Sequence, residues 1–120
     1  MRTITLADGK KINIRATNLA LLFYKQEFGN SLLVDFQKMI DQGEENIDEV
    51  FLMQAIWAMH KASKKGKLED FINFIDSVEF DYSDLYMWES VIDELMCFFP
   101  ELTDEYEKRK ANAKKKQKNK

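Results

Sequence analysis

One stretch of the chain reads Val50-Phe51-Leu52-Met53-Gln54-Ala55-Ile56-Trp57-Ala58-Met59-His60, and Gln54 is its only clearly polar residue before the final histidine. As a helix it would carry apolar side chains on nearly every side, so other elements must enclose it. It is too short to span a membrane, which takes about 20 apolar residues. The stretch therefore predicts a central core helix that runs from about Asp48 to Lys65 and is stopped by Gly66.

The charges of the chain are divided between a body and a tail. Of its 120 residues, 1–107 hold 10 Lys and Arg against 21 Asp and Glu, whereas 108–120 hold eight Lys and Arg and no acid. We expect one globular domain over 1–106 and a disordered lysine-rich tail over 107–120. Cys97 is the only cysteine and no apolar signal segment follows Met1, so we expect a protein of the reducing cytoplasm.

Residues 1–16 predict a β-hairpin. Apolar and polar residues alternate on both sides of Asp8-Gly9, which is typical of two strands joined by a tight turn. A three-residue loop over 7–9 would set Ile4 opposite Ile12, with Gly9 in the left-handed conformation. The hairpin would then cover one side of the helical core.

Helical periodicity fills most of 18–106. A first helix over 19–28 would be capped by Thr17 or Asn18 and ended by Gly29, a second would begin at Asn30-Ser31, and a fourth would span 68–78. The side chains expected to face the core in these three helices are Leu19, Leu22, Phe23, Gln26, Leu32, Leu33, Phe36, Met39, Ile40, Leu68, Phe71, Ile72 and Ile75. The sequence therefore predicts an α+β protein, with an N-terminal β-hairpin packed on a bundle of about five α-helices.

A fifth helix, capped by Ser83 or Asp84, follows a segment in which acidic and aromatic residues alternate. Its core stripe is expected to consist of Leu85, Trp88, Ile92, Leu95 and Phe99, and a second apolar stripe lies beside it on Met87, Val91 and Phe98. The second stripe is either covered by the hairpin or available to a partner. We expect a partner-binding surface made of Tyr82, Tyr86, Met87, Val91 and Phe98. The alternative is that these residues complete the core or form a homo-oligomer contact.

Residue types that carry catalysis are sparse. The single histidine, His60, and the single cysteine, Cys97, stand near the ends of two different predicted helices and do not make a nucleophile with its base. His60 is interpreted as a residue favoured by the helix dipole, and Cys97 as a small buried apolar residue. Asp81 and Asp84 lack the ligand spacing of a calcium loop, and no zinc or nucleotide motif is present. We therefore expect a protein that is not an enzyme and uses no cofactor or metal.

The basic tail suggests one rival function. Its eight positive charges would attract nucleic acid with a strong salt dependence, so a small nucleic-acid-associated regulatory protein is the alternative. The acidic body repels the same phosphates, and the tail contains no aromatic residue that could stack on a base. Nucleic acid is therefore the less favoured partner.

Two stretches carry a further pattern, Leu22 to Asp35 and Ala55 to Ala62 with the Leu68-Glu69-Asp70-Phe71 that follows. In the first, an aromatic and basic pair precedes Phe28-Gly29. In the second, a step of small residues, Met and Lys precedes an acidic-aromatic helix start. The pattern resembles that of the tail assembly chaperones of long-tailed phages of Gram-positive bacteria, and the resemblance covers most of residues 1–100.

The resemblance implies a non-enzymatic protein of the bacterial host cytoplasm that is absent from the mature virion. Such a chaperone keeps the long tape measure protein soluble while the tail tube polymerises around it. The tape measure protein is therefore the expected partner, and the tail tube protein is a further candidate. A chaperone for a long helical client needs exposed apolar or aromatic surface rimmed by charge. No membrane association is expected.

The resemblance also predicts a feature of the gene. Members of the family often make a longer product by ribosomal frameshifting near the end of the short one, and Lys114-Lys115-Lys116-Gln117-Lys118 can be encoded by an adenine-rich slippery run. We expect the codons over Lys114 to Lys116 to form such a run and an open reading frame to continue in the overlapping register. The DNA sequence checks this, and stop codons in that register would argue against a longer product.

Overall fold

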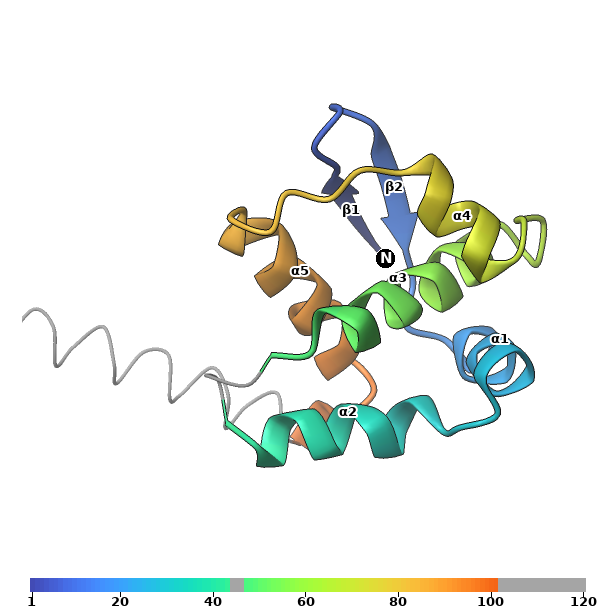
Figure 1. Ribbon diagram of the computed structural model, residues 1–120. Helices are drawn as coiled ribbons and strands as arrows, with labels where there is room; N and C mark the ends of the chain where they lie inside the picture. The colour runs from blue at the N-terminus through green and yellow to red at the C-terminus, as the bar shows by residue number, and fades with distance from the viewer. Residues whose placement is uncertain (44–46, 102–120) are drawn as a thin grey trace, which may run out of the picture.

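The computed structural model describes residues 1–43 and 47–101 and has an α+β fold (Figure 1). Among these residues it has a two-stranded antiparallel hairpin followed by five helices. The elements are β1 (Arg2–Thr5), β2 (Lys11–Ile14), α1 (Asn18–Phe28), α2 (Leu32–Asp41), α3 (Glu49–Ser63), α4 (Phe71–Ser77) and α5 (Leu85–Met96). The predicted hairpin on a bundle of helices is confirmed. The predicted domain end at residue 106 and the predicted disordered tail over 107–120 lie outside the described residues.

Helix α3 occupies the centre of the domain. Strand β2 and helices α1, α2, α4 and α5 all pack against it, and Figure 1 shows it running between the hairpin and α2. Its carboxylate cap, Asp48, accepts the N–H of Phe51 at 3.1 Å. The buried residues of α3 are Phe51, Leu52, Ala55, Ile56, Trp57, Ala58, Met59 and Ala62. Since they occupy most of the helix circumference, the prediction of a central core helix is confirmed.

The hairpin has the register that the alternation of residues predicts. Ile4 lies opposite Ile12. The N–H of Leu6 donates to the carbonyl of Lys10 at 2.8 Å, which leaves 7–9 as a three-residue loop. Gly9 has a φ of 85°, the left-handed conformation that this loop requires. The face of the hairpin buried against the helices consists of Ile4, Leu6, Ile12 and Ile14.

Side-chain caps also determine where three helices other than α3 begin. Ser31 caps α2 by accepting the N–H of the third residue on, and Asp84 does the same for α5. Asp70 caps α4, so this helix begins at Phe71. The predicted start of this helix at Leu68 is therefore wrong, because Asp70 has extended backbone dihedrals and its carboxylate accepts the N–H of Asn73 in the first turn.

Several side chains that were predicted to face the core are exposed. They are Leu19, Leu22, Gln26, Ile40, Ile72 and Leu85. In α1 the reason is Tyr24, which is fully buried together with Ala20 and whose ring packs 4.8 Å from that of Phe28. The inward face of α1 therefore follows Ala20, Tyr24 and Phe28, with Leu21 also packed on the core, and not Leu19 or Leu22.

A buried carboxylate connects α5 to the N-terminal segment. Glu94 is 4% exposed. Its Oε2 accepts the N–H of Ala16 at 2.9 Å, and its Oε1 lies 3.4 Å from Nε of Arg2. The N-terminal ammonium of Met1 lies 4.0 Å from Oε2. Because a buried carboxylate is tolerated only with such partners, these contacts hold α5 against β1 and the segment that leads into α1.

Replacing Glu94 with Ala should destabilise the fold, because the N–H of Ala16 would lose its acceptor. We expect the free energy of unfolding to fall by about 1–3 kcal/mol, measured by urea denaturation. The control is Glu27→Ala on the exposed surface of α1, which should change it by less than about 0.5 kcal/mol. Equal losses in the two variants would show that Glu94 does not hold the hairpin side of the domain.

Candidate functional site

The connection between α4 and α5, residues 78–84, is organised around the indole of Trp88. This side chain is 5% exposed. The rings of Phe80 and Tyr82 pack on it with centroid separations of 5.4 and 5.9 Å, and Tyr82 is stacked at an interplanar angle of 15°. The indole N–H donates to the carbonyl of Asp81 at 3.1 Å. Trp88 therefore holds both the backbone of the connection and its two aromatic side chains.

The carboxylate of Asp81 closes the turn that precedes α5. Its Oδ1 accepts the N–H of Ser83 at 2.9 Å and the hydroxyl of Ser83 at 2.6 Å, as in an Asx turn. These two bonds lower the pKa of Asp81 below its ordinary value. Asp84, which follows Ser83, accepts the N–H of Met87 at 3.1 Å and caps the start of α5. The turn and the first turn of α5 thus form one hydrogen-bonded unit.

The connection is also attached to the hairpin. The N–H of Ala7, in the hairpin loop, donates to the carbonyl of Glu79 at 3.1 Å. Val78, beside it, is buried. In Figure 1 the connection crosses the hairpin on its way from α4 to α5. Both halves of the connection are therefore hydrogen-bonded to other parts of the domain.

Three large side chains with apolar surface are exposed where this connection meets α5. Tyr82, Leu85 and Tyr86 are 59%, 72% and 82% exposed, and together they are called the Tyr82–Tyr86 patch below. Tyrosine is enriched among the residues that dominate protein-binding energy. Side chains on a backbone that is already ordered lose less entropy on binding. The patch therefore has the properties of a preformed protein-binding surface.

The structure corrects part of the predicted partner surface. Met87 and Val91 are 3% and 0% exposed, so the prediction that they are exposed to a partner is wrong. Helix α5 packs against both α3 and β1, and the core therefore takes up Met87 and Val91 as well as most of the first stripe. Phe98 is half-buried and packs against the core. Tyr82 and Tyr86 are exposed as predicted.

Leu85 belongs to the patch, although its helical spacing had assigned it to the core stripe. It is the first residue of α5, directly after the Asp84 cap. A side chain in the first turn can extend beyond the elements that cover the rest of the helix. The N-cap at Asp84 was thus the signal in the sequence that could have placed Leu85 on the surface.

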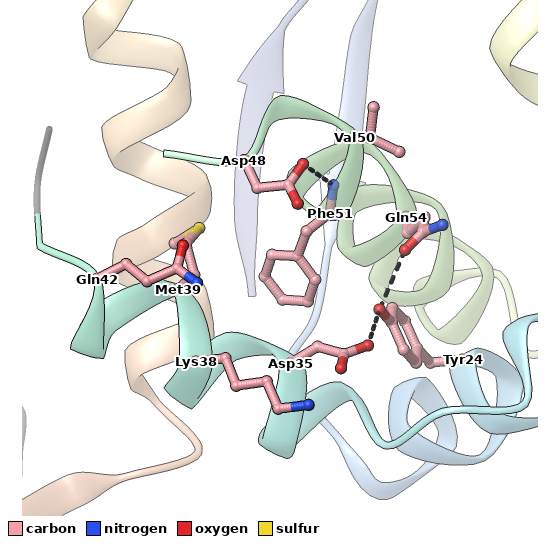
Figure 2. Close-up of a pocket in the computed structure, with 9 residues that line it drawn as sticks. All are labelled: Tyr24, Asp35, Lys38, Met39, Gln42, Asp48, Val50, Phe51 and Gln54. Carbon is pink, nitrogen blue, oxygen red and sulfur yellow. Dashed lines mark hydrogen bonds between the residues drawn. The ribbon is translucent and has the colours of Figure 1, made fainter. Parts of the chain in front are cut away.

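A cavity of about 340 Å³ lies between α1, α2 and the start of α3 (Figure 2). The hydroxyl of Tyr24 donates to Asp35 Oδ2 at 2.8 Å and lies 3.1 Å from Gln54 Oε1. Burial and the bond to Asp35 raise the pKa of Tyr24, so this hydroxyl remains protonated at neutral pH. These bonds join three helices, which gives the polar groups a structural role. The cavity is lined by Tyr24, Asp35, Lys38, Met39, Gln42, Asp48, Val50, Phe51 and Gln54.

His60 and Cys97 bond to different parts of the chain. Nδ1 of His60 donates to the carbonyl of Asn13 at 2.7 Å, which attaches α3 to β2, and burial lowers the pKa of His60. Cys97 is exposed, so the prediction of a buried cysteine is wrong. It follows the last residue of α5, and its thiol lies 3.7 Å from the carbonyl of Asp93. Nδ1 of His60 also lies 3.5 Å from the hydroxyl oxygen of Ser63, and this hydroxyl is hydrogen-bonded to the backbone carbonyls of His60 and Asn13.

The described residues contain neither a metal-binding cluster nor a membrane-spanning helix. Within 1–43 and 47–101 there is no group of three or more His, Cys, Asp or Glu side chains that could hold a metal ion. None of the described helices is long and apolar enough to cross a membrane. Comparisons with protein-family models, with curated proteins and with solved structures find no match to this chain.

His60 predicts a pH dependence of stability. Because its pKa is lowered in the folded state from the ordinary 6.5, the unfolded chain binds the proton more readily between the two values. The stabilisation is present above the unfolded pKa, and the free energy of unfolding should decrease as the pH falls through this window. His60→Gln removes the titrating group and should give a flatter profile between about pH 5 and pH 7. Urea denaturation at each pH measures this, and parallel profiles would exclude His60 as the cause.

Proposed function

We propose that this protein is a tail assembly chaperone of a long-tailed phage, which binds the tape measure protein and keeps it soluble without catalysis. The observation that carries the proposal is the Tyr82–Tyr86 patch, an exposed surface in which the ring of Tyr82 stacks on the buried Trp88. The resemblance of Leu22 to Asp35 and of Ala55 to Ala62 to the phage family supports the identity of the client. The site of action is then the cytoplasm of the bacterial host, and the protein leaves before the virion is complete.

The size of the patch suits a chaperone. A tape measure protein that awaits the tail tube exposes apolar helical surface, which aggregates unless it is covered. Three side chains cover only a small area, and small interfaces are characteristic of transient complexes. Such a contact can shield the client and still release it when tube subunits polymerise around it.

The charge of the body suits the same role. Residues 1–107 carry 10 basic and 21 acidic residues, and a net charge far from zero keeps a protein soluble and opposes self-association. A client covered by several copies of an acidic domain would acquire part of that solubility. Phosphates would be repelled by the same charge, which favours a protein client over nucleic acid.

Co-expression with the tape measure protein of the same genome tests the proposal. The wild-type chain should raise the soluble fraction of the client several-fold and be recovered bound to it. Replacing Leu85 and Tyr86 together by Ser should abolish both effects, since these exposed side chains carry the contact. The matched control is Leu22→Ser on α1, which is also exposed and should behave as wild type.

Circular dichroism on each variant distinguishes loss of the contact from loss of the fold. A client that stays insoluble and unbound beside a folded wild-type chain would overturn the proposed function. If the Leu85→Ser, Tyr86→Ser variant binds and solubilises the client as well as the wild type does, the patch is not the client-binding surface.

A further inference from the structure

The second half of the body carries charge of one sign only. Residues 68–107 contain 13 Asp and Glu and no Lys or Arg, and all ten basic residues of the body lie within 1–67. Helix α4, the connection and helix α5 all belong to this segment. These elements therefore contribute only negative side-chain charge to the surface that they form, and the basic groups in contact with α5, Arg2 and the N-terminal ammonium, come from the start of the chain.

The patch lies inside this acidic segment. Glu79 and Glu89 precede and follow it in the sequence, and both are exposed. Asp81 is also exposed and its pKa is lowered by Ser83. Exposed carboxylates beside exposed tyrosines suit a cation on a long aliphatic stem, because the stem and the ring can pack while the charge pairs.

We propose that the Tyr82–Tyr86 patch and its flanking carboxylates recognise a basic amphipathic helix, a client segment in which Lys or Arg side chains border an apolar stripe. The inference rests on the proposed function and names the chemistry of the client segment. The apolar stripe covers Leu85 and Tyr86, and the bordering cations pair with Glu79 and Glu89. The single sign of charge steers the client to this face and makes its binding dependent on salt.

The exposed leucines of α1 provide the internal comparison. Leu22 is 48% exposed, but its surroundings in sequence include both Lys25 and Glu27. Opposite charges close together cancel at a distance, so this face has no preference for a cationic partner. The patch at the start of α5, by contrast, lies within the acidic segment, as does the exposed Ile72 of α4.

A synthetic helix tests the inference with the full-length protein. The probe is a fluorescein-labelled peptide of roughly 18 residues, five turns of helix, with leucines on one face and lysines elsewhere. Its counterpart has glutamate in place of each lysine. Anisotropy titrations should show binding of the lysine peptide, binding at least about tenfold weaker for the glutamate peptide, and loss of affinity with added salt.

Paired variants separate the charges from the apolar contact. Glu79→Gln with Glu89→Gln should weaken binding of the lysine peptide by about tenfold and flatten its salt dependence. Glu27→Gln, an exposed acid on α1, is the control and should bind as wild type. Leu85→Ser with Tyr86→Ser should lose binding, whereas Leu22→Ser should retain it. Circular dichroism shows that each variant is folded.

Several outcomes would overturn the inference. Equal binding of the two peptides, or no effect of Glu79→Gln with Glu89→Gln, would exclude a basic ligand. If that charge variant still solubilises the tape measure protein while Leu85→Ser with Tyr86→Ser does not, the proposed function stands and the inference alone fails. If the wild-type chain does not bind the tape measure protein at all, the proposed function itself is wrong.

Two further results would assign the acidic face to another occupant and overturn the partner assignment. If the peptide binds only after Lys114, Lys115 and Lys116 are replaced by Gln, the basic segment of the chain itself occupies the face. If sedimentation shows self-association that Glu79→Gln with Glu89→Gln abolishes, a second copy of the chain occupies it.

Discussion

The fold depends on the burial of α3, a helix that is apolar around most of its circumference. A helix satisfies its own backbone hydrogen bonds, so it can lie in the middle of a small domain if other elements remove its side chains from water. Strand β2 and the other four described helices do so. Polar contacts then fix the position of the covering elements, with Glu94 tying α5 to the N-terminal segment and Tyr24 tying α1 to α2 and α3. The side chains that are not needed to cover α3 remain on the surface of the domain.

Local patterns predicted the elements well, because the forces that define them act over a few residues. The alternation around Asp8-Gly9 gave the hairpin register, and Gly29 marked the end of α1. The faces of the helices were predicted less well, since they depend on contacts between distant residues. Tyr24 determines the inward face of α1 through Asp35 and Gln54, and no helical periodicity contains that information.

The same distinction applies to the candidate site. Tyr82 and Tyr86 were assigned to the partner surface because a chaperone needs exposed apolar or aromatic residues rimmed by charge, and both are exposed. Met87 and Val91 were wrongly assigned to the surface because helical periodicity does not show how many elements pack against α5. In the fold both α3 and β1 contact this helix. Once the core has used these stripes, the apolar surface of α5 that remains lies in its first turn. There Trp88 orders the preceding connection, and acidic residues set the sign of the surrounding potential.

The central claim is that a preformed surface at the start of α5 binds the client. Hydrogen exchange of backbone amides, compared between the free chain and its soluble complex with the tape measure protein, tests it most directly. We predict that exchange slows on binding in peptides covering residues 79–89 and is unchanged in α1 and α2. Protection confined to α1 or α2, with residues 79–89 exchanging as in the free chain, would contradict the claim.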